Sequence, residues 1–317
     1  METPSRNETI VDAFAAAAPE VAIAFTDPDR LDRFISAISA DPSGEWPAKI
    51  GLAGAGPGAL GTRRVSSVHF GNEFCERLLP SRAELESAIK LISAAGVGVS
   101  LVAPLLTDDG LDAAQQLLEA LPDDSEVVAN DWGLMRRVRR RFPRLCLSAG
   151  RLLCRMLKEP RAPSAQYMEL GGHGFMSPGL EGLLRRFGVN RIEIDVPPFA
   201  TVEDLRAPDH QVSVHVPFGF TTVGRICRIG SLHQPPARKF ATGHNCAREC
   251  LSYVTAMESP REPRGSEIRV FQRGNTIFYR HTPAMSAVVA DAIGAGMVDR
   301  VIVSGDWNEA GSANLSA

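Results

Sequence analysis

The feature that most constrains the fold of this chain is a unit that recurs along it. Each unit has a short apolar run, a polar turn that can cap a helix, and an apolar pattern of helical period. The first joins an apolar run at residues 21–25 to Pro28, which suits the first turn of a helix. The second joins residues 65–70 to a capping box formed by Ser81 and Glu84. Both units predict a strand followed by a helix.

Eight apolar runs of this kind occur, and strands that alternate with helices imply parallel pairing through right-handed crossovers. Eight of them fit an α/β fold of the (β/α)₈, TIM-like barrel type, regular or distorted, with a doubly wound open sheet as the alternative. At roughly 150 residues per domain, 317 residues hold two ordinary domains or one such barrel. The strand candidates are residues 21–25, 65–70, 97–103, 126–129, 145–147, 191–196, 212–216 and 300–303.

The rest of the chain is expected to form tails and insertions around one barrel-type domain. We predict an N-terminal tail at residues 1–18, a barrel domain at 19–308 that includes a cysteine-bearing loop at 219–255, and a C-terminal tail at 309–317. Two stretches rich in Gly, Pro and Ser, at 42–64 and 156–178, are expected to be loop insertions. A hairpin is predicted late in the chain, at residues 269–280, with Gly274 and Asn275 at its turn.

Composition excludes several classes of protein. Hydrophobic residues make up 44% of the chain, so it can bury a sizeable core, and the net charge of −3 provides no basic field for nucleic acid. The longest apolar stretch, residues 97–106, is far short of the roughly 20 residues that span a bilayer. No basic region precedes the apolar run at 13–19, so we expect no signal peptide, a cytoplasmic location and reduced cysteines.

The cysteines form the most specific local pattern. Eighteen residues separate Cys227 from Cys246, and Cys250 follows four positions later. Cys246 and Cys250 lie among polar neighbours, where an inert buried thiol is less expected. Cys75 and Cys227 each follow a predicted barrel strand, so all four thiols are expected at the same rim of the barrel. Four thiolates suit a [4Fe–4S] cluster, with a Cys₄ zinc site as the alternative. The other two cysteines, Cys146 and Cys154, lie among leucines and are interpreted as small buried hydrophobes.

Four polar residues near the ends of predicted strands are candidates for binding or orienting a ligand at the same rim. Asn130 and Asp131 end the fourth strand, Asp195 lies beside Glu193 near the end of the sixth, and His215 ends the seventh. Helix capping explains Asp131 equally well, and His215 could be a satisfied structural histidine. No pair among them has the arrangement of an assigned acid and base.

Other motifs carry less functional weight. Residues 56–61 match the G-x-G-x-x-G pattern, but no clear strand precedes them and no capped helix follows, so they are interpreted as a flexible loop. Five arginines between Arg136 and Arg141 fall on one predicted helix and are interpreted as its solvated face, with an anionic partner as the alternative. Neither G-x-S-x-G nor H-E-x-x-H occurs, which argues against an autonomous serine or zinc peptidase.

Together, these segments make the chain resemble the collagenase-like peptidase family (unassigned peptidase family thirty-two). Within that family it is similar to the UbiV-like proteins of anaerobic ubiquinone biosynthesis. The similarity runs from about residue 20 to residue 305, and its specific part is the order of the cysteines, one early and three late. The interval between Cys227 and Cys246 is longer than in those proteins, so the loop is expected to differ in shape. The matching segments are residues 68–75 (VHFGNEFC), 127–133 (VVANDWG), 214–227, the pair Cys246 and Cys250, and 297–301 (MVDRV).

The resemblance implies a function. Carried over to this chain, it implies a [4Fe–4S] cluster on Cys75, Cys227, Cys246 and Cys250. It also implies a role as iron–sulfur subunit of an oxygen-independent hydroxylation system that acts on an aromatic or quinone-precursor substrate. The implied partner is a paralogous UbiU-like subunit, in a heterodimer. A non-catalytic iron–sulfur sensor or scaffold subunit is the alternative, and a collagenase-like peptidase is less favoured because no nucleophile motif is visible.

Overall fold

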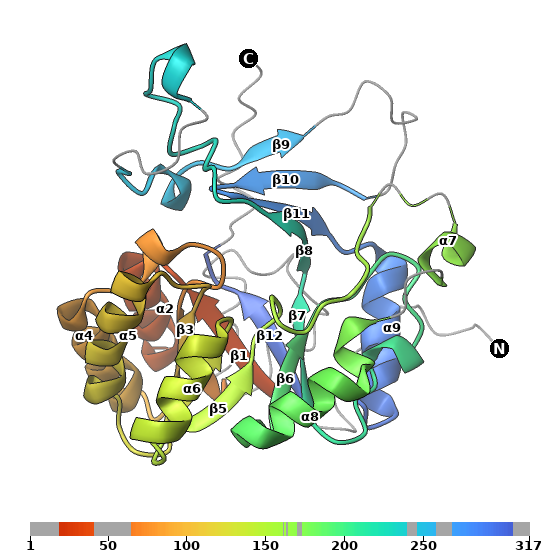
Figure 1. Cartoon of the computed structure of the whole chain (residues 1–317), viewed down its shortest axis with the longest axis horizontal. Helices are drawn as coiled ribbons and strands as arrows, with labels where there is room; N and C mark the ends of the chain where they lie inside the picture. Colours follow the sequence, from red (N-terminus) through yellow and green to blue (C-terminus); the bar gives the residue numbers. More distant parts are fainter. Residues whose placement is uncertain are drawn as a thin grey trace.

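The computed structural model describes residues 19–40, 65–160, 162, 164–169, 173–239, 246–257 and 268–306. A barrel surrounded by helices forms the lower part of Figure 1, and a smaller sheet lies across its upper end. The predicted tails at 1–18 and 309–317 lie outside the described residues, as does the glycine-rich segment at 56–61. The whole of the predicted insertion at 42–64 also falls outside them.

The larger part is a closed barrel of eight strands, in the order β1-β12-β7-β6-β5-β4-β3-β2, and all of its strand pairs are parallel. The (β/α)₈ prediction is therefore confirmed, and the eight strands coincide with the eight predicted apolar runs to within about two residues at each end. The strands are β1 (Glu20–Phe25), β2 (Ser67–Gly71), β3 (Gly98–Ala103), β4 (Glu126–Ala129), β5 (Cys146–Ala149), β6 (Arg191–Ile194), β7 (Gln211–Val216) and β12 (Arg300–Ser304).

Helices surround the barrel, and the capping box that the sequence predicts is present. Ser81 and Glu84 form both hydrogen bonds of a capping box at the start of α4, and the arginines of α6 lie mostly on its exposed face. The α-helices are α2 (Pro28–Ala40), α4 (Arg82–Ala94), α5 (Asp108–Ala120), α6 (Trp132–Arg141), α7 (Ala165–Glu169), α8 (Pro178–Phe187) and α9 (Pro283–Gly294). Short 3₁₀ turns are η2 (Glu76–Leu78), η3 (Gly174–Met176), η4 (Glu203–Leu205), η5 (Pro236–Arg238) and η6 (Glu249–Leu251).

The main apolar core lies between the barrel and its helices, whereas the barrel interior is largely polar. On β6, Ile192 and Ile194 belong to the apolar core cluster. Arg191 and Glu193, which alternate with them, form hydrogen bonds to polar side chains of other barrel strands. Because successive side chains of a strand point to opposite faces, these charged residues point into the barrel. Ion pairs inside the barrel therefore take the place of the usual layers of branched aliphatic residues.

The smaller part is a four-stranded antiparallel sheet, in the order β8-β11-β10-β9. Its strands are β8 (Phe218–Val223), β9 (Thr255–Met257), β10 (Val270–Arg273) and β11 (Thr276–Arg280). The predicted hairpin is confirmed as β10 and β11, with Gly274 at a φ of 60° in its turn. The hairpin is not isolated, however. Two of its strands were not predicted: β8, which follows β7 after Pro217, and β9, which has only three residues.

One of the two cysteines interpreted as buried hydrophobes is exposed. Cys154 is buried, as predicted, but Cys146 is the first residue of β5 and lies open to solvent. The flanking leucines were misleading, because Leu145 and Leu147 pack into the apolar core, whereas Cys146 alternates with Leu147 and shares the opposite face with Ser148. Within the described residues, no helix has both the length and the apolar character that crossing a membrane requires.

Candidate functional site

A cavity of about 890 Å³ lies between the C-terminal ends of the barrel strands and the small sheet. The barrel contributes residues such as Thr26, His69 and His215, and the small sheet contributes Phe218 and Phe278. TIM-type barrels place their active sites at this end of the strands. The four cysteines that follow barrel strands or flank the small sheet, Cys75, Cys227, Cys246 and Cys250, also line the cavity.

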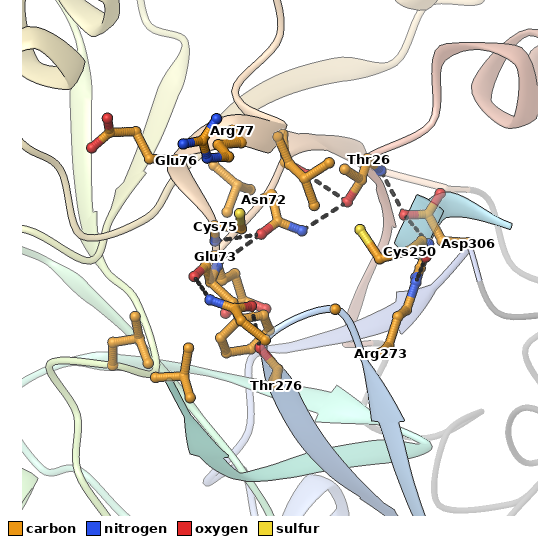
Figure 2. Close-up of a pocket in the computed structure, with 18 of the residues that line it drawn as sticks. Thr26, Asn72, Glu73, Cys75, Glu76, Arg77, Cys250, Arg273, Thr276 and Asp306 are labelled. Atoms are coloured by element: carbon orange, nitrogen blue, oxygen red, sulfur yellow. Dashed lines mark hydrogen bonds and ion pairs between the residues drawn. The ribbon is translucent and has the colours of Figure 1, made fainter. Parts of the chain in front are cut away.

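Cys75 is held by the loop that leaves β2. The amide oxygen of Asn72 accepts hydrogen bonds from the backbone N–H groups of Phe74 (2.9 Å) and Cys75 (2.8 Å), which fixes the turn (Figure 2). The amide nitrogen of Asn72 donates to Thr26 Oγ1 at 3.2 Å and so ties this loop to the end of β1. Gly71, at a φ of 129°, permits the sharp exit from β2, because a β-carbon there would collide with the carbonyl oxygen of Val102.

Cys227 and Cys246 accept hydrogen bonds from nearby backbone amides. The Gly230 N–H lies 3.1 Å from Cys227 Sγ, and the Arg248 N–H lies 3.3 Å from Cys246 Sγ. Arg248 has a left-handed backbone, with a φ of 58°, which turns its N–H back toward the sulfur. Backbone N–H groups directed at sulfur stabilise its negative form, and such hydrogen bonds are among the factors that tune iron–sulfur clusters.

Cys250 lies against the turn of the β10–β11 hairpin. A β-carbon on Gly274 would lie 3.5 Å from Cys250 Sγ and 4.0 Å from Cys227 Sγ, so both sulfur atoms pack around this turn. Arg273 Nε donates to the backbone oxygen of Cys250 at 2.9 Å and also forms an ion pair with Asp306 (Figure 2). The small sheet therefore positions two of the four thiols over the cavity.

The surroundings of Cys75, Cys227 and Cys250 raise the pKa of each thiol and so favour its protonated form. Burial raises the pKa of Cys75 and Cys227, and in Cys75 the neighbouring thiolates of Cys227 and Cys246 raise it further. Burial raises the pKa of Cys250 to about 12, an effect that nearby Arg273 only partly offsets. Thiolates that disfavour one another in this way are stabilised together by a cation. Four thiols, two with backbone N–H donors, thus form a donor set of the kind that binds an iron–sulfur cluster or a zinc ion.

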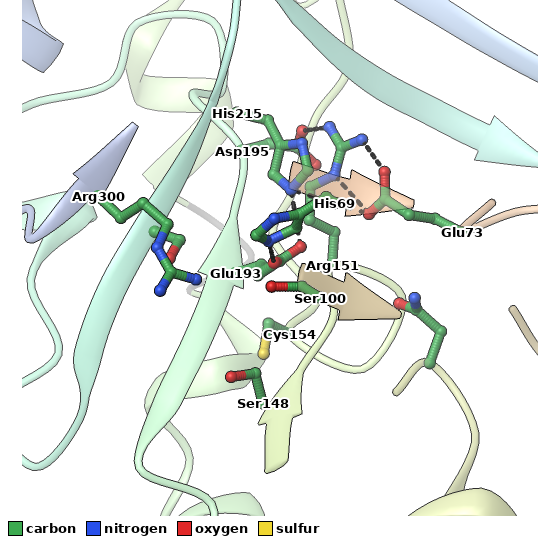
Figure 3. Close-up of polar contacts among 12 residues, drawn as sticks. His69, Glu73, Ser100, Ser148, Arg151, Cys154, Glu193, Asp195, His215 and Arg300 are labelled. Carbon is green, nitrogen blue, oxygen red and sulfur yellow. Dashed lines mark hydrogen bonds and ion pairs between the residues drawn. The ribbon is translucent and has the colours of Figure 1, made fainter. Parts of the chain in front are cut away.

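The floor of the cavity contains a buried network of charges centred on Arg151. This guanidinium forms a two-point contact with the carboxylate of Glu73, in which Nε lies 2.9 Å from Oε1, and its Nη1 lies 2.6 Å from Asp195 Oδ1 (Figure 3). Lys158 pairs with the other oxygen of Asp195. Burial would raise the pKa of Asp195, but the charges of Arg151 and Lys158 outweigh it and lower the pKa to about 2.

Beside this network, Glu193 is fully buried between two histidines. Its Oε1 lies 3.0 Å from His69 Nε2, and its Oε2 lies 2.8 Å from His215 Nε2 (Figure 3). Burial would raise the pKa of Glu193, but the histidines hold it well below its ordinary value. His215 is also 3.9 Å from Glu73 Oε1, so it connects the Glu193 group to the Arg151 network. Of these residues, His69, Glu73, Arg151 and His215 line the cavity.

Aromatic side chains from the small sheet and the Cys75 loop cover the charged floor. Phe74 packs against Phe220 and Phe278, with ring centroids 5.0 and 5.3 Å apart. Lys158 Nζ lies 3.3 Å from the centre of the Phe220 ring, and Arg151 lies over the rings of Phe74 and Phe220. Cation–π contacts of this kind stabilise buried charges where water is excluded. The cavity thus has a charged floor, an aromatic wall and cysteines at its rim.

The structure separates the four polar residues that the sequence singles out. His215 lines the cavity, and Asp195 lies behind it, bound to Arg151 and Lys158. Asn130 and Asp131 do not line it. Asn130 bridges the ends of β3 and β5 through Ala103 O and the Leu152 N–H, and Asp131 caps α6. Both residues thus have structural contacts at the strand ends, and their role in orienting a ligand stays a prediction.

Four residues of the charged floor were not predicted to have a role: His69, Glu73, Arg151 and Lys158. Glu73 and Arg151 follow the ends of β2 and β5, so the argument from strand ends that selected Asp195 and His215 would also have selected them. His69 lies within a strand, where a histidine among apolar neighbours gives no such signal. Lys158 belongs to an irregular segment, and nothing in the sequence relates it to Asp195.

Comparisons with known proteins do not identify a family. No family model matches the chain, and no curated protein matches it. Among solved structures, a phosphodiesterase from Oleispira antarctica in complex with sn-glycerol-3-phosphate is similar at 15% identity and a TM-score of 0.33, over 64% of this chain and 85% of that one. A candidate sporulation-specific glycosylase from Bacillus subtilis is similar at 13% identity and a TM-score of 0.28, over 90% and 89%. At these values neither structure bears on the chemistry of the cavity.

Proposed function

We propose that Cys75, Cys227, Cys246 and Cys250 hold a [4Fe–4S] cluster at the rim of the cavity. We further propose that the chain is the iron–sulfur subunit of an oxygen-independent hydroxylation system acting on an aromatic or quinone-precursor substrate, as the sequence resemblance implies. The observation that carries the proposal is that thiols from separate segments of the chain all line one cavity. A cytoplasmic location, where thiols stay reduced, is part of the proposal.

The chain's own residues would bind and orient the substrate beside the cluster. A [4Fe–4S] cluster with four cysteine ligands has no open iron position, so when bound it would supply electrons or structural support. The rings of Phe74, Phe218 and Phe278 form an apolar wall against which a planar aromatic ring can stack. His215 and Arg151 at the floor would orient its polar substituents, because both line the cavity while held by buried carboxylates.

The other functions are supported less well by the cavity. A sensor or scaffold subunit needs the cluster but has no use for a cavity of about 890 Å³ with a charged floor. A peptidase needs an activated nucleophile. His69 and His215, the histidines that line the cavity, both hydrogen-bond to the Glu193 carboxylate instead of a hydroxyl or thiol. The paralogous UbiU-like partner rests on the resemblance alone.

Metal analysis of anaerobically purified protein tests the cluster. We expect brown protein with about four irons and four sulfides per chain. Cys75→Ser should lose the cluster, whereas Cys154→Ser should keep it, because that buried thiol does not line the cavity. A single tightly bound zinc ion without sulfide, or loss of iron in Cys154→Ser but not in Cys75→Ser, would overturn the ligand assignment.

The hydroxylation proposal needs a separate test of activity. The chain should be co-expressed with its nearest paralogue, supplied with aromatic quinone precursors under strict anaerobiosis, and assayed for hydroxylated product. Candidate oxygen donors labelled with ¹⁸O should identify the source of the oxygen atom. A reaction that requires O₂, or one that persists when all four cysteines are replaced by serine, would contradict the proposal.

A further inference from the structure

The floor of the cavity contains donor atoms of the kind that bind a metal ion, in a group separate from the cysteines. Glu73 and Glu193 each offer a carboxylate oxygen and His215 offers a ring nitrogen, and these three atoms all lie within 4.8 Å of one another. Ligands about 2.1 Å from a tetrahedral ion are roughly 3.4 Å apart. The distances from His215 Nε2 to Glu193 Oε2 (2.8 Å) and Glu73 Oε1 (3.9 Å) fall on either side of that value.

His69 holds the Glu193 carboxylate from its other side. The side chain of His69 is 1% exposed, and its Nε2 lies 3.0 Å from Glu193 Oε1. Its Nδ1 is buried and has no hydrogen-bond partner among the described residues, so the contact with Glu193 is the one that positions this ring. His69 therefore orients the Glu193 carboxylate, as residues behind metal ligands commonly do.

The buried carboxylates of the floor differ in their cationic partners. Arg151 and Lys158 both bind Asp195, and Arg151 also binds Glu73. Within the described part of the chain, Glu193 has two histidines as ion-pair partners and neither an arginine nor a lysine. A buried carboxylate held by imidazoles alone is a position that a bound cation would stabilise.

We infer that Glu73, Glu193 and His215 form a binding site for one divalent first-row transition-metal ion at the floor of the cavity. Mixed carboxylate and imidazole donors suit ions such as Mn²⁺, Fe²⁺ and Zn²⁺, in contrast to the soft thiolate set at the rim. Glu73 can bind the ion while it accepts hydrogen bonds from Arg151, because a carboxylate has about four acceptor positions. Glu73 and His215 line the cavity, so the remaining coordination position opens toward it.

This inference goes beyond the proposed cluster and does not depend on it. Three protein ligands with one open position form the arrangement of catalytic metal sites. An ion held there can polarise a carbonyl or hydroxyl group of a ligand, or lower the pKa of a bound water. The site would thus provide the cavity with an electrophile that a fully ligated cluster does not supply.

Mn²⁺ binding tests the site directly, because Mn²⁺ prefers carboxylate over thiolate ligands. Free Mn²⁺ is measured by its EPR signal while the anaerobic full-length chain is titrated. We expect one Mn²⁺ per chain, displaced by one Zn²⁺, in the wild type and equally in a variant with all four rim cysteines replaced by serine. His215→Gln and Glu73→Gln should each weaken Mn²⁺ binding at least tenfold.

The matched control is His210→Gln, because His210 forms a similar pair with Glu181 at 2.7 Å, away from the cavity. It should leave Mn²⁺ binding unchanged. Glu73→Gln serves as the second variant because the Glu73 side chain is less buried than that of His215 or Glu193. Circular dichroism tests whether each variant is folded. Binding that is absent in the wild type, lost with the cysteines, or retained in both His215→Gln and Glu73→Gln would overturn the inference. A chain that lacks a cluster but still binds Mn²⁺ would refute the proposed function alone.

Discussion

Arg151→Met is the substitution that tests the energetics of the cavity floor most directly. The Arg151 side chain is 4% exposed and pairs with two carboxylates, so its removal leaves Glu73 without an ion-pair partner at hydrogen-bond distance and Asp195 with Lys158 alone. Breaking a buried ion pair costs about 3–5 kcal/mol, because the remaining charge stays buried. Lys158 still compensates Asp195, so we expect a loss near the lower limit, about 3 kcal/mol.

The pH dependence of this loss provides a second, independent check. The pKa of Asp195 is lowered from 3.8 to about 2, which corresponds to roughly 2 kcal/mol of stability that is complete at neutral pH. Because the folded-state pKa is depressed, that stability is lost as the pH falls from about 4 toward 2. Without Arg151 the pKa of Asp195 rises, and protonation of Asp195 then leaves one fewer buried negative charge for Lys158 to compensate. The difference between wild type and variant should therefore shrink on acidification.

Urea unfolding followed by circular dichroism, at pH 7 and at about pH 4, measures the difference. Arg206→Gln is the control, because Arg206 pairs with Glu203 on the exposed surface, where an ion pair contributes at most about 1 kcal/mol. A loss below about 1 kcal/mol for Arg151→Met at pH 7, or a loss that grows as the pH falls, would refute the reasoning.

Two further predictions concern the backbone and the remaining thiols. Gly71→Ala should lower the free energy of unfolding by at least about 3 kcal/mol in the same urea assay, because alanine at a φ of 129° would be strained and would collide with the carbonyl oxygen of Val102. A loss of less than about 1 kcal/mol would contradict this backbone geometry. Pulse alkylation of folded protein, followed by peptide mass spectrometry, should modify exposed Cys146 and spare Cys154, whose pKa is raised strongly by burial. Equal labelling of the two would show that β5 is not packed as described.

The barrel could be predicted from the sequence because it depends on local and periodic signals. Each strand of the barrel has a short apolar run, and helix caps such as Ser81 with Glu84 mark where the helices begin. The small sheet was predicted only in part. Its hairpin has a turn signal at Gly274, whereas β8 follows Pro217 directly and β9 has three residues, so neither carries a pattern long enough to detect.

The candidate site, like the fold, could be predicted only in part from the sequence. Cysteine spacing and the rule that parallel strands end at one rim were enough to place four thiols at a common cavity. The same rule also selected Asn130 and Asp131, which do not line this cavity, because a polar residue at a strand end can equally bridge strands or cap the next helix. Strand ends identify where a site can be, but they do not distinguish a side chain that enters the cavity from one that holds the loop.

The charged floor could not be predicted because its members are related only through the closed barrel. His69, Arg151, Glu193 and His215 come from or follow four different strands, and parallel pairing brings together residues separated by up to 146 positions. In sequence, each is a single polar residue among apolar ones, compatible with an exposed face or a buried pair. Inside the barrel these residues contact one another. His69 orients the Glu193 carboxylate, and Glu193 in turn hydrogen-bonds to His215, which lines the cavity. A ligand or metal ion bound to His215 would therefore act on the whole network.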